Sequence, residues 1–246
     1  MILNILKKMK NISYYKLTLP IKRCLYLRKY SKSSPGTTTW LVGTEIKYGG
    51  YITNVQRNKV SPIDPRSEEK IETGGMTGGD RMLHNGYATK YSKYILPYVN
   101  SNKQVTLAEV GILMGTGLAI WCDLFPNGRI LGFDIDLTHI NRNMSRLKSI
   151  GAFKRNIPEL YEYDQFLDNT KYLGSILKNN KIDICIDDGF HSDEAILTTM
   201  KSVLPYLGDS FVYFIEDNEN VYKKLKLIYP NFSFEYKDEL TIISKQ

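Results

Sequence analysis

The stretch VTLAEVGILMGTGLAIWCDLFPNGRILGFDID, residues 105–136, decides the fold of this chain of 246 residues. Residues 105–110 form a short apolar run that leads into a glycine-rich turn, and residues 116–125 carry apolar side chains at helical spacing. A second apolar run, Arg129–Asp134, follows. This order of strand, glycine turn, helix and strand predicts a βαβ unit, in which the two strands lie parallel in one sheet.

The same alternation continues to the end of the chain. Helices are predicted over 87–99, 139–150, 168–179, 193–207 and 219–229, and strands over 159–163, 182–187 and 211–216. The last two strands, 232–236 and 240–244, flank a short turn and indicate an antiparallel hairpin. We therefore expect an α/β fold: a doubly wound, Rossmann-like sheet, mostly parallel, with a C-terminal antiparallel hairpin and helices on both faces.

The chain before this domain, which we place at 81–246, has a different composition. Residues 1–35 hold nine Lys or Arg and no acid, and residues 2–12 gather their apolar side chains on one helical face. We expect a basic amphipathic N-terminal extension there. Residues 36–80 are expected to hold a hairpin around Gly49-Gly50 and a glycine-rich loop, a candidate lid.

The net charge of +7 arises in that extension, because residues 36–246 carry −2. A domain without a basic excess argues against nucleic-acid binding. The extension favours one of two roles: peripheral contact of residues 1–30 with an anionic membrane, or packing against the domain or a second subunit in a homo-oligomer.

The sequence also indicates where the protein is located. No apolar run approaches the ~20 residues of a membrane span, and no signal peptide is recognisable. Because the three cysteines are also widely spaced, we expect a cytoplasmic protein.

The first two strands of the predicted sheet end in candidate cofactor-binding residues. Glu109 stands two residues before Gly111, and Gly115 lies further along the same turn. Ile120 replaces the third glycine of the dinucleotide fingerprint, which opposes an NAD-linked oxidoreductase. An acid beside the glycines suits a cationic ligand, a nucleoside that carries an amino acid such as S-adenosylmethionine. The alternative is a turn whose glycines serve packing only.

Further acids follow the second and third strands. Asp134 and Asp136 end the second strand, where a carboxylate can accept hydrogen bonds from ribose hydroxyls. Asp164 follows the third strand and is either an acceptor for an adenine amino group or a solvated loop acid.

Carboxylates also end the fourth and fifth strands, which we expect to be neighbours. They are Asp187, Asp188, Glu216 and Asp217. Carboxylates packed this closely need a cation, and Mg²⁺ prefers such oxygen ligands. His191, three residues past Asp188, is a candidate general base. The alternative for each residue is a helix cap or a first-turn position.

These motifs together resemble a known family. LAEVGILMGTGLAIWCDLFPNGRILGFDID, YDQ, IDICIDDGFH, YFIEDNE and the upstream GGDRMLHNGYATKYSKYILPYV are similar to the metal-dependent sugar O-methyltransferases of macrolide biosynthesis and to the related cephalosporin C7-methylation proteins. The resemblance covers roughly residues 78–243. It implies Mg²⁺ on Asp188, Glu216 and Asp217 with His191 as base. The chain departs from the family at Phe190, where a small serine is usual.

The expected function is transfer of a methyl group from S-adenosylmethionine to a hydroxyl of a sugar or glycan, with Mg²⁺ as second cofactor. The expected cofactor-binding residues are Asp80, Glu109, Gly111, Gly115, Asp134, Asp136, Asp164 and Asp187. A catechol-like or antibiotic acceptor stays open, as does a non-catalytic nucleoside-binding protein. An RNA methyltransferase is opposed by the charge of −2 on the domain.

Overall fold

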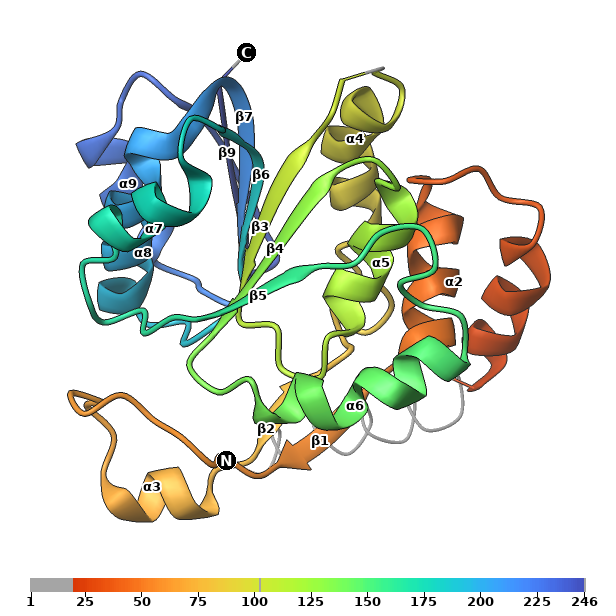
Figure 1. Ribbon diagram of the computed structural model, residues 1–246, viewed down its shortest axis with the longest axis horizontal. Coiled ribbons are helices and arrows are strands. Elements are labelled where there is room, and N and C mark those ends of the chain that lie inside the picture. Colours follow the sequence, from red (N-terminus) through yellow and green to blue (C-terminus); the bar gives the residue numbers. More distant parts are fainter. Residues whose placement is uncertain (1–19, 102, 246) are drawn as a thin grey trace, which may run out of the picture.

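The computed structural model describes residues 20–101 and 103–245, and within them a sheet of seven strands organises the chain (Figure 1). Its order is β5-β4-β3-β6-β7-β9-β8. The parallel strands are β3 (Thr106–Val110), β4 (Arg129–Asp134), β5 (Glu159–Glu162), β6 (Ile182–Asp187) and β7 (Leu207–Ile215). The antiparallel strands are β8 (Ser233–Lys237) and β9 (Leu240–Lys245). The predicted fold class is confirmed, and the chain reverses its direction of winding between β3 and β6.

Helices cover both faces of the sheet and enclose two cores. One face carries α2 (Thr38–Tyr48), α4 (Ala88–Val99), α5 (Thr116–Leu124) and α6 (Thr138–Ser149). The other carries α7 (Thr170–Leu177), α8 (Asp193–Val203) with the short η1 (Leu204–Tyr206), and α9 (Val221–Ile228). Every residue of β3 is buried, with Leu107 in the first core and Ala108 in the second. Strands covered on both faces are mostly apolar, and this makes the run recognisable in the sequence despite Glu109.

The predicted hairpin around Gly49-Gly50 is wrong. The residues before the glycines form α2, whose Trp40, Leu41 and Ile46 pack into the first core. Gly49 ends that helix, and Gly50 has φ +71°, a left-handed conformation that favours glycine. A glycine pair after a helix marks its end as readily as it marks a hairpin turn.

The next segment, residues 49–80, is called the arm below. It holds β1 (Ile52–Val55), which pairs antiparallel with β2 (Met76–Gly78), and between them α3 (Glu68–Thr73), which buries no residue. The arm lies along the carboxyl edge of the sheet, at the bottom of Figure 1. The predicted glycine-rich loop therefore contains a helix and a strand.

One residue of α2 fixes both ends of the arm. The main-chain carbonyl of Glu45 accepts hydrogen bonds from the amides of Gly49 and Gly50, each at 3.0 Å. Its carboxylate accepts from the amides of Met82 (2.8 Å) and Leu83 (3.0 Å), just past the arm. Glu45 is buried, so these bonds are shielded from water.

The N-terminal extension is described only in part. Residues 20–30 are helical and expose Ile21, Leu25 and Leu27. The amphipathic helix predicted over 2–12 lies outside the described residues, and the membrane contact and the homo-oligomer stay predictions. Across the described part of the chain, every helix is too short or too polar to cross a membrane.

Candidate active site

Three strands end at one cavity of about 370 Å³, between the carboxyl edge of the sheet and the arm. The turns after β3, β6 and β7 each hold a non-glycine residue with positive φ: Leu113 (39°), His191 (61°) and Asp217 (54°). All three line the cavity. Such conformations cost about 1–3 kcal/mol and persist only where surrounding contacts fix them. The turns that line this cavity are therefore held in shape by the rest of the fold.

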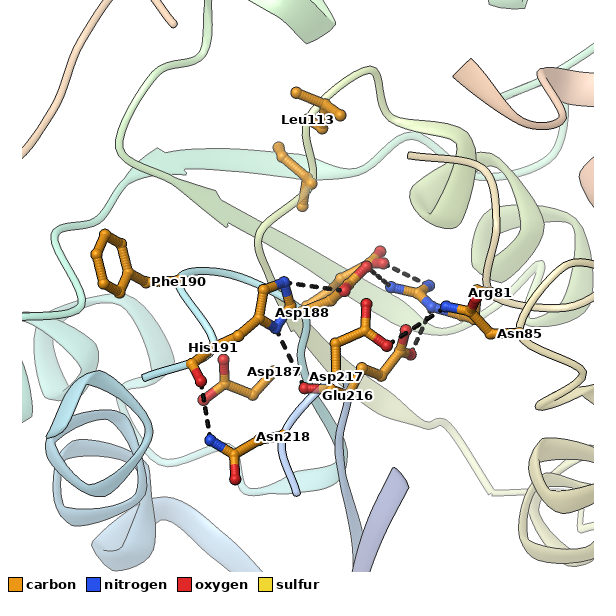
Figure 2. A network of polar contacts seen from close by, with 12 residues as sticks. Arg81, Asn85, Leu113, Asp187, Asp188, Phe190, His191, Glu216, Asp217 and Asn218 are labelled. Carbon is orange, nitrogen blue, oxygen red and sulfur yellow. Dashed lines mark hydrogen bonds and ion pairs between the residues drawn. The ribbon is translucent and has the colours of Figure 1, made fainter. Parts of the chain in front are cut away.

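A single buried arginine joins the three strand ends (Figure 2). Arg81 follows the arm directly. Its guanidinium pairs through Nη1 with Glu109 (2.6 Å), through Nη2 with Asp188 (2.8 Å) and through Nε with Glu216 (2.6 Å). These acids lie at the ends of β3, β6 and β7, so acids from all three strands share one cation.

The two glutamates at this arginine are fully enclosed. Glu216 also accepts a hydrogen bond from the Tyr91 hydroxyl, and Glu109 accepts one from Trp121 Nε1 (3.0 Å). Burial raises the pKa of Glu216 well above its ordinary value, although Arg81 favours the ionised form. Both carboxylates are thus engaged with groups of the protein itself.

Arg81 was not among the residues predicted from the sequence. The signal was present, because carboxylates that converge at one sheet edge need positive charge nearby. The predicted site takes all of that charge from a metal ion, whereas in the structure Arg81, within the segment GGDRM, supplies part of it from the protein.

Two of the three predicted metal ligands do come together, and His191 lies beside them. One ligand atom each from Asp188, His191 and Asp217 lies within 4.8 Å of the others. Asp217 Oδ1 accepts from the Tyr87 hydroxyl (2.8 Å) and weakly from Asn85 Nδ2 (3.4 Å). Burial raises the pKa of Asp188 to about 7, with Arg81 and His191 opposing the rise. The third predicted ligand, Glu216, faces Arg81 instead.

The imidazole of His191 is oriented by the backbone. Its Nδ1 lies 3.1 Å from the carbonyl oxygen of Glu216, which can only accept, so Nδ1 carries the hydrogen. Nε2 then holds a lone pair and lies 3.9 Å from Asp188 Oδ1. The carbonyl of His191 accepts from Asn218 Nδ2 (2.8 Å), which fixes the turn. This is the tautomer that a general base needs.

The predicted glycines serve close packing within the protein. A Cβ on Gly111, at φ +85°, would lie 2.0 Å from the carbonyl oxygen of Asp188, so only glycine lets the turns after β3 and β6 meet. A Cβ on Gly115 would lie 2.6 Å from Ile140. Gly111 therefore shapes the site, whatever ligand it takes, while Gly115 lets the turn pack against α6 and lines neither cavity.

The predicted nucleoside-binding acids line the other end of the cavity. Asp134 accepts from the amides of Ile112 and Leu113 through Oδ2, and from that of Asp136 through Oδ1, each at 3.0 Å. Burial raises the pKa of Asp134, while these bonds act the other way. Asp164 lines the cavity and accepts from the amide of Phe166 (3.0 Å).

Asp136 is tied to the arm. It accepts from the amide of Thr138 (2.9 Å) and from Asn58 Nδ2 (3.0 Å), and His139 Nε2 lies 3.5 Å away. Burial would raise its pKa, but these hydrogen bonds hold the pKa below its usual value. Asn58 therefore spans from the arm to the nucleoside end of the cavity.

Three further predicted residues differ in their placement. Asp80 lines the cavity, and burial together with Asp217 raises its pKa. Glu109 lines only a smaller adjoining cavity of about 60 Å³. Asp187 lines neither and accepts from Gln165 Nε2 (2.8 Å) and the Tyr213 hydroxyl (3.1 Å), so this geometry lends no support to its contact with a cofactor.

Comparison with known proteins gives two curated relatives. Over 144 residues the chain is 27% identical to the mycinamicin VI 2''-O-methyltransferase of Micromonospora griseorubida, covering 55% of this chain and 32% of that protein. Over 169 residues it is 24% identical to the 8-demethyl-8-alpha-L-rhamnosyl tetracenomycin-C 2'-O-methyltransferase of Streptomyces olivaceus, covering 66% and 39%. The chain thus spans less than half the length of the curated relatives it matches. Both are named O-methyltransferases, and the resemblance drawn from the motifs is confirmed.

The chain was also compared with protein-family models and with solved structures. No protein-family model matches the chain. Among solved structures, the MycE methyltransferase from the mycinamycin biosynthetic pathway, in complex with Mg, SAH and mycinamycin VI, has a TM-score of 0.49 at 19% identity, covering 65% of this chain and 50% of that one.

Proposed function

We propose that this chain is an S-adenosylmethionine-dependent O-methyltransferase that requires Mg²⁺ and methylates a hydroxyl group of a sugar or glycan. The observation that carries the proposal is His191, which turns its basic Nε2 toward Asp188 in a cavity that Asp217 also lines. The named O-methyltransferase relatives support the reaction type. The rhamnosyl group in one of those names supports a sugar acceptor.

The donor set fits a hard divalent cation. Mg²⁺ is usually held by one or two carboxylates together with water and substrate oxygens. Asp188 and Asp217 would supply those carboxylates, and a cation between them would offset their mutual repulsion, while Asp188 keeps its Oδ2 on Arg81. Glu216 as a third ligand stays a prediction, because its buried carboxylate is held by both Arg81 and the Tyr91 hydroxyl and lies outside the group that Asp188, His191 and Asp217 form.

Each residue around the acceptor would then have a separate role in the reaction. A bound divalent cation would stabilise the alkoxide form of the acceptor hydroxyl. His191 takes the hydroxyl proton at Nε2, an effect typically worth ~10²–10⁴ in rate. The Glu216 carbonyl keeps the imidazole in its working tautomer and stabilises the imidazolium that forms. Tyr87 holds Asp217 in place.

The nucleoside end of the cavity fits the second cofactor. An ionised carboxylate offers about four lone-pair sites, and Asp134 uses three of them on backbone amides. One site is left for a ribose hydroxyl. Asp164 lies further along the same wall, where an adenine amino group would donate. The cofactor would supply a methyl group on a sulfonium, and the fold contributes its alignment with the acceptor oxygen.

Calorimetry and a methyl-transfer assay test this proposal together. We expect S-adenosylhomocysteine to bind the full chain, and Asp134→Ala to weaken that binding while Mg²⁺ binding is unchanged. We expect transfer of a labelled methyl group to a sugar panel, abolished by a chelator and restored by Mg²⁺. Full turnover in excess chelator would refute metal dependence. Binding of both cofactors without turnover on any hydroxyl compound would favour the non-catalytic alternative.

A further inference from the structure

The arm contributes two arginines to the wall of the cavity that faces the sheet edge. Arg66 pairs with Asp64 through Nε and Nη2. Its guanidinium also lies over the ring of Phe190, 4.5 Å from the centroid. Phe190 in turn meets Phe166 edge to face at 4.7 Å. This arginine is therefore held by Asp64 and by Phe190, the residue that precedes His191 in the chain.

Arg57 is the second arginine, and its charge is less well matched. Its Nη1 donates to the carbonyl oxygen of Gly74, and in the described part of the chain it makes no ion pair. Lys59, on the same wall, pairs with Glu162 at 2.6 Å. Burial lowers the pKa of Arg57, and the nearby charge of Arg66 lowers it further, so the two guanidinium groups act on one another.

The cavity is also lined by six carboxylates besides that of Asp64, those of Asp80 and of the five aspartates at the strand ends. Among the lining residues of the arm from Arg57 to Thr77, however, Asp64 is the single carboxylate beside the two guanidinium groups, and this local excess of positive charge favours an anionic group at that part of the cavity.

The proposed cofactor does not account for this positive charge. Adenine and ribose are neutral. The amino-acid end would lie toward Glu109 and the glycines after β3, which line the smaller cavity, and neither Arg57 nor Arg66 lines that cavity. The anion therefore belongs to the acceptor.

We propose that the acceptor is an anionic sugar, whose carboxylate or phosphate group is bound by Arg57 and Arg66 while a hydroxyl group lies at His191. This inference rests on the proposed function and specifies its substrate class. In the reaction the acceptor oxygen forms a bond to the methyl carbon, the carbon–sulfur bond breaks with its electron pair left on a neutral thioether, and the hydroxyl proton passes to Nε2 of His191. The arginines take no part in these bond changes, so their contribution is to binding and orientation.

The test uses three sugars that differ in charge: glucose, glucuronate and glucose 1-phosphate. Each is titrated into the full chain loaded with S-adenosylhomocysteine and Mg²⁺. A charge-assisted contact typically changes affinity by roughly 10- to 100-fold, so one or both anionic sugars should bind that much more tightly than glucose. Preference for glucuronate identifies a carboxylate, and preference for glucose 1-phosphate identifies a phosphate.

Three variants make the assignment specific. Arg57→Gln should remove the preference for the anionic sugar and leave the affinities for glucose and S-adenosylhomocysteine unchanged, while Arg57→Lys should keep part of it. Arg155→Gln, an exposed arginine outside the cavity, is the matched control and should change nothing. Equal affinity for the three sugars, or an equal loss for all three in Arg57→Gln, overturns the inference and leaves the proposed function standing. Failure to bind S-adenosylhomocysteine refutes the proposed function itself.

Discussion

The cavity has two walls, and they are built differently. The wall at the sheet edge consists of the turns that follow the parallel strands, and buried Arg81 makes three ion pairs with acids at the ends of β3, β6 and β7. The wall from the arm is more exposed. Its helix α3 buries no residue, and the pair of Lys59 with Glu162 leaves about half of each side chain exposed (48% and 62%).

The difference in burial between the two walls suits them to different roles. Local opening is easiest where few apolar groups are buried and hydrogen bonds face water, which describes the arm. We propose that the arm opens to admit ligands and closes around them, while the sheet edge keeps His191 and the two aspartates in a fixed geometry. On this proposal the chemistry lies on the rigid wall and the recognition of the acceptor on the movable one.

The largest effect should come from the acids of the rigid wall. Asp217→Asn or Asp188→Asn should remove Mg²⁺ binding and lower methyl transfer by more than about 10³-fold, because a metal ion typically stabilises the developing charge by several kcal/mol. Calorimetry with Mg²⁺ and the methyl-transfer assay measure both. Asp209→Asn, an exposed acid away from the cavity, is the control.

The same site should depend on pH. The pKa of Asp188 is raised to about 7 in the metal-free protein, so below that pH a proton must leave before a cation binds. Mg²⁺ affinity should therefore be full above about pH 7 and fall as the pH drops through it. An affinity that is constant from pH 5 to 8 would contradict the raised pKa of Asp188, and the loss of Mg²⁺ binding in Asp188→Asn would then decide alone whether Asp188 is a ligand.

The next effect concerns His191. His191→Ala should lower kcat by ~10²–10⁴ with the affinities for Mg²⁺ and S-adenosylhomocysteine little changed. The measurement is steady-state kinetics over a range of pH. In the plot of kcat against pH, the variant should lose the rise in rate that deprotonation of the general base produces in the wild type. A loss of Mg²⁺ affinity instead would make His191 a ligand and not the base.

A matched pair of substitutions compares the stability of the two walls. Arg81→Met leaves buried Glu109 and Glu216 without their cation and should cost about 3–5 kcal/mol of unfolding free energy. Arg57→Met on the arm loses one hydrogen bond to the carbonyl of Gly74 and should cost only about 1 kcal/mol. Denaturant unfolding measures both, and equal losses would contradict the contrast between the walls.

The last prediction concerns Glu45, the residue at which the two walls join. Burial raises the pKa of Glu45 to about 8 from its ordinary value near 4.5, so the folded state binds its proton more tightly than the unfolded chain does. The stability from this proton is full below about pH 4.5 and is lost as the pH rises through about 8, by at most ~1.4 kcal/mol per pH unit. Relative to Glu45→Gln, the wild type should become less stable across that range. Parallel curves for the two proteins would show that Glu45 does not titrate there.

The rigid wall was largely predictable from the sequence, and the reason is physical. β3 and β6 are buried on both faces, so their apolar runs stand out, and a parallel sheet brings their carboxyl ends to one edge. The proximity of Asp188, His191 and Asp217 follows from this arrangement of the strand ends. Which carboxylate faces which partner does not, because Glu216 and Asp217 are adjacent in the chain yet face Arg81 and Tyr87 respectively.

The arm and α2 were not predictable in the same way. The glycine pair after Tyr48 is consistent with either a hairpin turn or a helix end, and only the packing of Trp40 and Leu41 into the core decides between them. In the arm, β1 pairs with β2, and the paired residues are more than twenty positions apart in the sequence. No local sequence pattern predicts such a pairing. The alignment of Arg57 and Arg66 on one wall depends on that pairing.

Glu45 holds both ends of the arm, and this has a consequence for how such a chain can diversify. Because the entry and exit of the segment meet at one residue, the enclosed chain is a loop whose ends stay fixed whatever lies between them. Doubling the length of a flexible loop costs only about 0.6 kcal/mol in closure entropy. Insertions, deletions and whole replacements between Gly50 and Asp80 should therefore be tolerated while the strand ends keep their geometry. If the proposed function holds, a change of acceptor needs the replacement of only this segment of about thirty residues, much as an antibody changes its antigen through loops on a constant frame.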